Sequence, residues 1–428
     1  MAKNRNPASH WQTRLQLLLL VCGSSFGASL SGEEWPEFRG PTGQGHTEVQ
    51  NLPVQWDADT NIRWRRPIEG LGWSSPVCVD GHVYLTAAVP QPGADPPEVS
   101  LRVIALRVDD GSMVWTKEVL RQPADAPRIH QKNSHASPTV VVNARRLYAH
   151  FGHQGTVCLD LQGNTIWKNT ELGYRPVHGN GGTPALFDGG LYFSCDGGED
   201  PFLVALTAAD GRLRWRSPRV CDGVKKFAFS TPLVITVAGQ PLLISPGAQS
   251  VGAFDPKTGA EIWRVRYDGY SVIPRPVYGH GLVFISTGYD SPQVLAIRPD
   301  GAGDVTDTHV AWSFKKGAPH TPSLLLHDRE LYMVSDNGIA SCLDAISGDL
   351  IWQQRLGGNF SASPLYGDGK LYFQSESGVG SVLRAGRKFE LLSSNDLGER
   401  TLASYAVAGR GFLIRSAENL YRVEERGQ

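Results

Sequence analysis

Eight positions along the chain share a similar local sequence, and seven of them carry a hydroxyl side chain. We expect these positions to begin the innermost strands of eight similar units, near a common axis. The eighth position is Arg275, a cation that needs a partner when buried. That partner is either a carboxylate ligand held by two hydrogen bonds or an Asp or Glu of a neighbouring unit. The seven hydroxyl residues are Ser75, Ser137, Thr183, Thr231, Thr321, Ser363 and Ser404.

Small hydroxyl side chains also have a simpler role at such an axis. They fit a crowded space and satisfy backbone groups or water molecules. The residues that lead into the inner strands combine cationic, amide and aromatic groups, which suits an anionic or polar ligand. We therefore predict a ligand-binding funnel at the axis. Its candidate residues are Arg275, His178, Asn180, His135, His320, Lys226, Tyr270 and Trp73.

Several signatures of catalytic and metal centres are absent from the sequence. It contains no H-E-x-x-H, no G-x-x-x-x-G-K-[ST] and no C-x-x-C. His150 and His153 form an H-x-x-H pair, but this spacing on a strand places the two side chains on opposite faces. We predict no catalytic residue and no metal ligand.

One motif that recurs eight times must position the funnel residues. Most copies have a small hydroxyl residue, a proline, two apolar runs separated by a turn and a short strand that ends in tryptophan. The proline-equivalent positions are spaced 62, 46, 48, 44, 46, 42 and 41 residues apart. They are Pro76, Pro138, Pro184, Pro232, Pro276, Pro322, Pro364 and Tyr405.

A period of 40 to 50 residues with four short strands is typical of a β-propeller. We predict an all-β fold, an eight-bladed β-propeller whose blades are four-stranded and antiparallel. The last copy ends before its fourth strand, and an orphan strand at residues 59–64 matches the missing one. We expect that strand to complete the last blade and to close the ring.

Tryptophans recur at the end of most copies, and in five copies a glycine lies four residues before the tryptophan. The glycine permits a tight hairpin, and the tryptophan covers the seam between two blades. The predicted docking tryptophans are Trp64, Trp115, Trp167, Trp215, Trp263, Trp312 and Trp352.

The N-terminus has the pattern of an export signal. Basic residues precede the apolar run 15–22, which is too short to span a bilayer, and small residues follow it. We predict a signal peptide at residues 1–28, a leader segment at 29–58 that is strapped on one face or flexible, and a single propeller domain at 59–425. The protein would be periplasmic or extracellular, and would contact a membrane only if Cys22 is lipidated.

The charge balance excludes general nucleic-acid binding. The chain of 428 residues has 41 Lys and Arg against 42 Asp and Glu, a net charge of −1. We expect a monomer with a protein partner. Five cysteines remain after the signal, and the sequence does not choose a disulfide pair among them.

The repeats resemble those of the pyrroloquinoline-quinone (PQQ) type of propeller, whose blades end in Gly-x-x-x-Trp. The leader at residues 34–45 (EWPEFRGPTGQG) and the stretches 177–182 (VHGNGG), 271–276 (SVIPRP) and 303–306 (GDVT) are similar to those of exported bacterial PQQ-like proteins. Such proteins are often likened to BamB, the propeller lipoprotein of the outer-membrane β-barrel assembly machinery.

This resemblance implies a non-catalytic module that binds or scaffolds a protein or polymer partner. The alternative that it implies is a PQQ-dependent oxidoreductase, or a quinone-binding protein, with PQQ and Ca²⁺ in the axial funnel. The sequence lacks the adjacent cysteine pair and the C-x-x-C-H haem motif of the quinoprotein dehydrogenases. We therefore favour the binding module and expect no cofactor.

Overall fold

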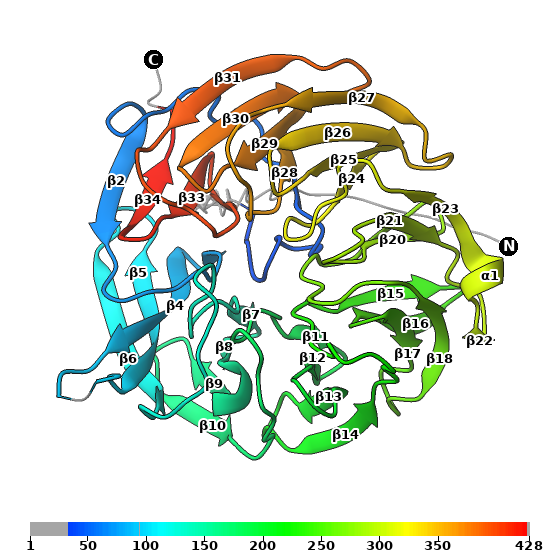
Figure 1. Cartoon of the computed structure of the whole chain (residues 1–428). Helices are drawn as coiled ribbons and strands as arrows, with labels where there is room; N and C mark the ends of the chain where they lie inside the picture. Colours follow the sequence, from blue (N-terminus) through cyan, green and yellow to red (C-terminus); the bar gives the residue numbers. More distant parts are fainter. Residues whose placement is uncertain (1–32, 94, 426–428) are drawn as a thin grey trace, which may run out of the picture. The chain divides into compact units, whose positions relative to one another are not determined.

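The computed structural model describes residues 33–93 and 95–425. The predicted signal peptide and Cys22 lie outside these residues. Eight antiparallel sheets follow one another around a central axis, with the first strand of each blade innermost in blades 1 to 7 (Figure 1). The predicted fold class, an eight-bladed all-β propeller, is confirmed.

Blades 1 to 4 contain the following strands: in blade 1, β3 (Val77–Val79), β4 (His82–Pro90), β5 (Val99–Arg107) and β6 (Met113–Gln122); in blade 2, β7 (Val141–Asn143), β8 (Arg146–His150), β9 (Thr156–Asp160) and β10 (Thr165–Asn169); in blade 3, β11 (Ala185–Phe187), β12 (Gly190–Cys195), β13 (Phe202–Thr207) and β14 (Leu213–Pro218); in blade 4, β15 (Leu233–Val237), β16 (Gln240–Pro246), β17 (Ser250–Phe254) and β18 (Glu261–Arg266).

Blades 5 to 8 contain these strands: in blade 5, β19 (Val277–Gly279), β20 (Leu282–Ser286), β21 (Val294–Ile297) and β23 (Val310–Phe314); in blade 6, β24 (Leu325–His327), β25 (Glu330–Val334), β26 (Ile339–Asp344) and β27 (Leu350–Arg355); in blade 7, β28 (Leu365–Gly367), β29 (Lys370–Gln374), β30 (Val379–Arg384) and β31 (Leu391–Asp396); in blade 8, β32 (Ala406–Ala408), β33 (Gly411–Arg415), β34 (Asn419–Val423) and β2 (Ile62–Pro67).

Two short strands extend blades from outside the repeat. Strand β1 (His46–Thr47) pairs in parallel with β28, and β22 (Gly303–Asp304) pairs in parallel with β18. The helical elements of the described chain are η1 (Gly152–Gln154) and α1 (Thr306–His309). In that part of the chain no helix has the length and apolar character needed to cross a membrane. The five cysteines in it are free thiols.

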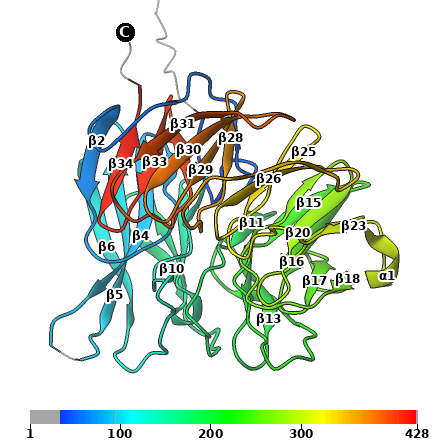
Figure 2. The same ribbon diagram turned by 45° about the horizontal axis from the view of Figure 1, so that its top comes forward.

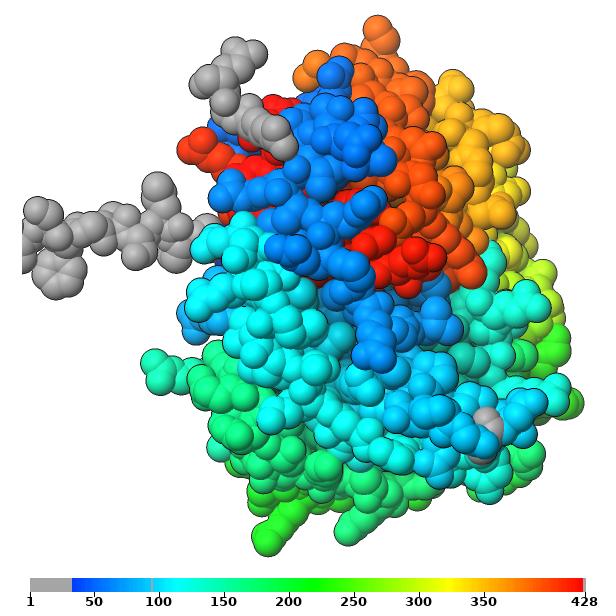
Figure 3. Space-filling view, turned by 90° about the vertical axis from the view of Figure 1, so that its left-hand side faces the viewer, coloured from blue at the N-terminus to red at the C-terminus, as the bar shows by residue number. Residues whose placement is uncertain are grey.

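The two ends of the propeller meet in blade 8. Strand β2 pairs antiparallel with β34, with Trp64 opposite Arg422 (Figure 2). Strand β2 and the leader, in blue, consequently lie beside the C-terminal strands, in red, on this flank of the molecule (Figure 3). Because the last strand of the blade comes from the start of the chain, this pairing covers the edge of β34 and joins the two ends of the propeller.

Each docking tryptophan bonds to the following blade. The indole N–H donates to a backbone carbonyl there, at 2.7 to 3.1 Å. The pairs are Trp64 with Val108, Trp115 with Leu161, Trp167 with Ala208, Trp215 with Pro256, Trp263 with Pro299, Trp312 with Ala345 and Trp352 with Gly386. Seven of the eight joints between blades therefore use the same contact.

The glycine of the Gly-x-x-x-Trp motif lies under the tryptophan of the preceding blade. A Cβ atom on Gly211 would come within 2.5 Å of the Trp167 ring, and one on Gly111 within 2.6 Å of Arg66 and 2.7 Å of the Trp64 ring. Both glycines also have positive φ angles, of 75° and 68°. Glycine is needed at these positions for the close approach of the indole as well as for the turn.

The joint between blades 7 and 8 uses a tryptophan of the leader. Strand β31 carries no tryptophan, and Trp56 is buried at this joint. Its ring lies edge-on to Phe412 of blade 8, with 6.0 Å between centroids, and contacts the position of Gly380 in blade 7. Its backbone N–H donates to Oδ1 of Asn395 at 3.0 Å.

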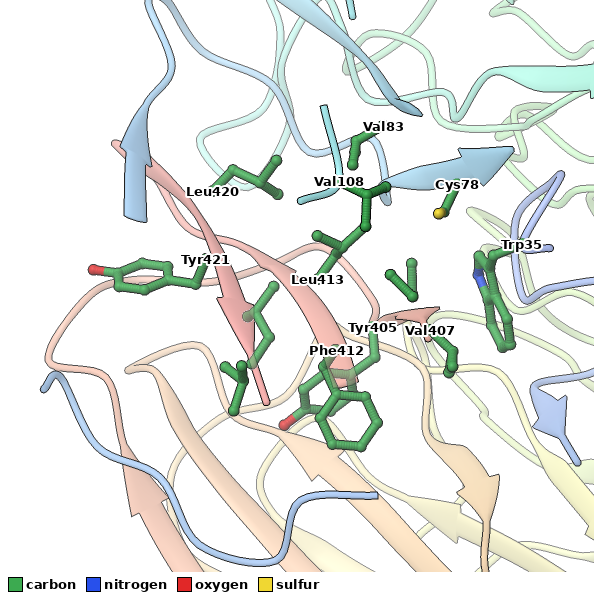
Figure 4. Close-up of a cluster of buried hydrophobic side chains, with 14 of the residues drawn as sticks. Trp35, Cys78, Val83, Val108, Tyr405, Val407, Phe412, Leu413, Leu420 and Tyr421 are labelled. Carbon is green, nitrogen blue, oxygen red and sulfur yellow. The ribbon is translucent and has the colours of Figure 1, made fainter. Parts of the chain in front are cut away.

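The leader also enters the core at the start of the ring. Trp35 is 1% exposed and exchanges two backbone hydrogen bonds with Cys78 of β3, at 2.8 and 2.9 Å. Trp35 lies in the apolar cluster where blades 8 and 1 meet, which also contains Leu413 and Phe412 (Figure 4). The leader residues from 33 onward are thus built into the fold.

Candidate functional site: a central cavity

A cavity of about 400 Å³ lies on the propeller axis. Every blade contributes to its wall through the connection that leads into its first strand. Blade 5 also contributes Tyr289, from between β20 and β21, and the leader contributes Phe38. The lining residues are Phe38, Trp73, Ser75, His130, Lys132, Asn133, Ser137, Thr139, His178, Gly181, Thr183, Phe227, Phe229, Thr231, Tyr270, Ser271, Ile273, Tyr289, Thr321, Ser323, Ser361, Ser363, Leu402, Ala403 and Ser404.

A ring of hydrogen bonds between blades surrounds the cavity. In each of seven joints, a backbone N–H at the entrance of one inner strand donates to the hydroxyl of the next blade, at 2.9 to 3.1 Å. The accepting hydroxyls, which we call the axial hydroxyl ring, belong to Ser75, Thr139, Thr183, Thr231, Ser323, Ser363 and Ser404. These hydrogen bonds join neighbouring blades where the inner strands begin, next to the propeller axis.

The sequence expectation was wrong for two members of this ring. It placed Ser137 and Thr321 there, whereas the hydroxyls that accept the backbone bonds are Thr139 and Ser323. The reason is the register of the prolines. In blades 2 and 6 the proline lies three residues before the inner strand, and in the other blades with a proline it lies directly before it. Ser137 and Thr321 still line the cavity.

Arg275 occupies the eighth position of the ring but does not line the cavity. The residue is 3% exposed. Its side chain carries no hydrogen-bond acceptor, so the ring is interrupted between blades 4 and 5. Its Nη1 donates to Oε1 of Glu37 at 3.1 Å and to the carbonyl of Phe38 at 2.7 Å. A Cβ on Gly43 would collide with the guanidinium. Arg275 therefore holds the leader, with a leader carboxylate as its partner.

The leader closes one end of the axis. Besides these bonds to Arg275, the carbonyl of Pro36 accepts from Val142 of blade 2 at 2.8 Å. The carbonyl of Gly45 accepts from Tyr366 of blade 7 at 2.8 Å. The segment is thus bonded to blades on several sides of the axis, and Phe38 forms part of the cavity wall.

A second arginine is buried in this closing segment. Arg39 is 2% exposed, and burial lowers its pKa to about 9, with a further lowering by the charge of Arg275. Its Nη2 donates to the carbonyl of Gln44 at 2.9 Å. Two buried guanidinium groups therefore lie in the closing segment, and Glu37 supplies the carboxylate partner of Arg275, which makes that carboxylate important for the stability of the closure.

Three of the other predicted funnel residues, Trp73, His178 and Tyr270, line the cavity together. The His178 ring lies edge-on to Phe227 at 5.2 Å and to His130 at 5.6 Å. Burial, and then the neighbouring His130, lower the pKa of His178.

The structure places the remaining predicted residues outside the lining. Asn180 accepts from the Tyr174 hydroxyl at 2.6 Å and is buried. His135 is hydrogen-bonded to Gln122 at 3.0 Å. His320 stacks on the lining residue Tyr289, with 4.6 Å between centroids. Lys226 is half-buried and is not among the lining residues.

Sequence reasoning missed three lining residues of the long connection between β6 and β7, although it named His135 and Ser137 from the same connection. His130, Lys132 and Asn133 line the cavity. Nζ of Lys132 lies 2.7 Å from Oε1 of Glu376, in the turn between β29 and β30 of blade 7. The sequence signal was the extra length of the first repeat, which shows an insertion but not the direction in which it folds.

The donor set of the cavity does not fit PQQ with Ca²⁺. None of its lining residues is Asp or Glu, and Lys132 is the one Lys or Arg among them. In residues 33–93 and 95–425 no three His, Cys, Asp or Glu side chains are grouped to hold a metal ion. Calcium prefers carboxylate and other oxygen ligands in sixes to eights. The lining therefore provides no carboxylate ligand set for a quinone-bound calcium ion.

The eight four-stranded sheets around a common axis place the protein among the eight-bladed β-propellers. A family model described as outer membrane protein assembly factor BamB matches residues 46–167 and 247–387, more than half of the chain. The chain therefore belongs to this family, and the resemblance to PQQ-type and BamB-like propellers is confirmed. No match was found among curated protein sequences.

Solved structures that share this fold include a BamB protein as well as alcohol and methanol dehydrogenases. BamB from Moraxella catarrhalis is 12% identical with a TM-score of 0.60, covering 86% of this chain and 98% of that one. A europium-containing methanol dehydrogenase is 10% identical with a TM-score of 0.65, covering 90% of each chain. A quinohemoprotein alcohol dehydrogenase from Pseudomonas putida HK5 is 13% identical with a TM-score of 0.63, covering 92% and 81%. At these identities the likeness shows the fold alone.

Proposed function

We propose that the protein is a non-catalytic, exported binding module that docks a protein or polymer partner on the face where the central cavity opens. The observation that carries this proposal is the chemistry of the cavity wall. Hydroxyl and aromatic groups make up most of the wall, together with His130, His178, Lys132 and Asn133. It contains no carboxylate among the lining residues, so it offers no carboxylate ligand for a calcium ion.

The two faces of the propeller differ in what they present. The leader covers the axis on the face of the short turns that follow the first strand of each blade, through its bonds to Arg275, Val142 and Tyr366. The other face carries the longer connections between blades. One of them exposes Val224 almost completely, at 96%. Exposed connections around a concave centre are suited to docking.

A cross-linking experiment tests the proposal in the cell that makes the protein. A photoreactive amino acid is placed at Val224, on the open face, or at Ile346, in the turn between β26 and β27 on the opposite face. We expect a discrete adduct from position 224 and none from position 346. Equal adducts from both positions, or none from either, would contradict a docking face at the cavity mouth.

A titration tests the alternative of a quinoprotein. The purified protein is titrated with PQQ and Ca²⁺ while tryptophan fluorescence is followed. We expect no saturable quenching, because the cavity lacks carboxylate ligands for the metal. Saturable quenching that depends on calcium would overturn the non-catalytic assignment.

A further inference from the structure

The axial hydroxyl ring presents seven buried hydrogen-bond donors to the cavity. Its seven members are each between 1% and 7% exposed, and all seven line the cavity. A hydroxyl group accepts hydrogen bonds and also donates one through its own proton. The oxygen of each ring hydroxyl accepts a backbone N–H from the preceding blade.

None of these seven hydroxyl protons has an acceptor among the described residues. For example, Thr231 Oγ1 accepts from the backbone N–H of Thr183 at 2.9 Å, and no bond donated by that hydroxyl occurs in this part of the chain. Ser363 Oγ likewise only accepts, from Ser323 at 3.0 Å. A buried donor without a partner is costly. Water or a ligand in the cavity must therefore supply several acceptor oxygens, and a ligand that carries many oxygens can take the place of the water.

The wall above the ring is aromatic and carries little charge. Trp73, Phe227, Phe229, Tyr270 and Tyr289 all line the cavity. The one Lys or Arg of the lining, Lys132, is paired with Glu376 at 2.7 Å. The lining thus contains no unpaired lysine or arginine that would select an anionic ligand. Aromatic faces suit a ligand with apolar C–H surfaces, and the hydroxyl donors suit one with many oxygens.

The cavity is blind, which limits how a ligand can enter. The leader crosses the axis, and Phe38 is held there by the bond from Arg275 to its carbonyl at 2.7 Å. A ligand must therefore enter from the opposite face and end inside the cavity. A volume of about 400 Å³ falls in the range of about 300–1,000 Å³ that is usual for small-molecule pockets.

We propose that this cavity binds an uncharged saccharide, whose hydroxyl oxygens accept hydrogen bonds from the axial hydroxyl ring and whose C–H faces lie on the aromatic wall. Both a free disaccharide and the end of a glycan chain have this chemistry. The inference goes beyond the proposed function, since it does not require a partner to dock on the open face.

Sugar titrations test the inference, with tryptophan fluorescence and calorimetry as readouts. The probes are maltose, cellobiose and N,N′-diacetylchitobiose, each compared with its tetrasaccharide. We expect saturable binding of at least one series, with a fluorescence change that Trp73→Phe removes. Equal affinity for the two lengths identifies a free disaccharide as the source, and tighter binding of the tetrasaccharide identifies a glycan end.

Substitutions in the ring locate the binding site. Thr231→Val keeps the side-chain shape but removes one hydroxyl, and we expect it to weaken binding about three- to tenfold, the effect of about one hydrogen bond. Thr231→Ser keeps the hydroxyl and should restore the affinity. Ser230→Ala is the matched control. It removes a buried hydrogen bond between blades, from Ser230 to the carbonyl of Pro274 at 2.8 Å, outside the lining.

Two results would overturn the inference. One is the absence of saturable binding for all six sugars by the folded protein. The other is binding that Thr231→Val and Ser230→Ala weaken equally, which would place the sugar elsewhere. Neither result depends on the cross-links from position 224, so failure of this inference is distinguishable from failure of the proposed function.

Discussion

The backbone N–H of Ser404 donates to Oγ of Ser75 at 3.1 Å, although the two residues are 329 positions apart in the sequence. This bond joins the last blade to the first at the axis. The strand pairing of β2 with β34 joins the same two ends in blade 8 at the periphery. The ring is therefore closed at two radii by different contacts.

Removal of the Ser75 hydroxyl tests the inner closure. Ser75→Ala leaves the buried N–H of Ser404 without its acceptor, and we expect the free energy of unfolding to fall by about 1–3 kcal/mol. Urea unfolding followed by tryptophan fluorescence measures the loss. Ser75→Thr keeps the hydroxyl and serves as the control. If both variants are equally destabilised, the size of the side chain matters more than the bond.

Gly211→Ala tests whether the motif glycine is needed for indole packing. The new Cβ would lie 2.5 Å from the Trp167 ring, at a φ of 75°. Gly239→Ala is a matched control, because Gly239 has a φ of 80° and no atom within 4 Å of its Cβ position. We expect Gly211→Ala to be less stable than the control by about 1–3 kcal/mol, the usual cost of overpacking. Equal losses would assign the role of the glycine to backbone conformation alone.

Glu37→Gln tests the closure of the axis by the leader. The substitution removes the carboxylate that lies 3.1 Å from the buried Arg275. We expect a loss of about 3 kcal/mol, since breaking a buried ion pair leaves an uncompensated charge. Faster protease cleavage of the leader should accompany it. Glu34→Gln, an exposed position in the same segment, is the control, and the proposal fails if both variants are cleaved at the same rate.

Acid sensitivity should depend on His150. Burial lowers the pKa of this histidine to about 3, with a smaller lowering by His153. The unfolded chain, with a histidine pKa near 6.5, then binds more protons than the folded one. The stability from His150 is therefore full above about pH 6.5 and declines as the pH falls toward 3, by up to about 1.4 kcal/mol per pH unit.

Stability measured between pH 7 and pH 4 checks this expectation. His150→Gln should flatten the decline, because glutamine does not titrate. His280→Gln, at an exposed position, should leave it unchanged. A slope that is the same in wild type and His150→Gln would show that other groups cause the acid sensitivity.

Much of the fold was predictable because each blade repeats a local pattern. The spacing of Gly211 and Trp215, and of their equivalents, marks one turn and one strand that neighbouring residues build by themselves. The register of the axial ring was less predictable. Proline spacing misplaced two positions, because Pro138 and Pro322 stand further from their inner strands than the other prolines do.

The sequence by itself determined the repeat, the number of blades and the strand that completes the last blade, since these depend on periodic local patterns. Only the tertiary structure decided the partner of Arg275, the crossing of the axis by Phe38 and the pairing of Lys132 with Glu376. The physical reason is that these contacts join residues more than 200 positions apart. A local sequence pattern does not indicate which distant side chain will pair with a charged residue when the ring closes.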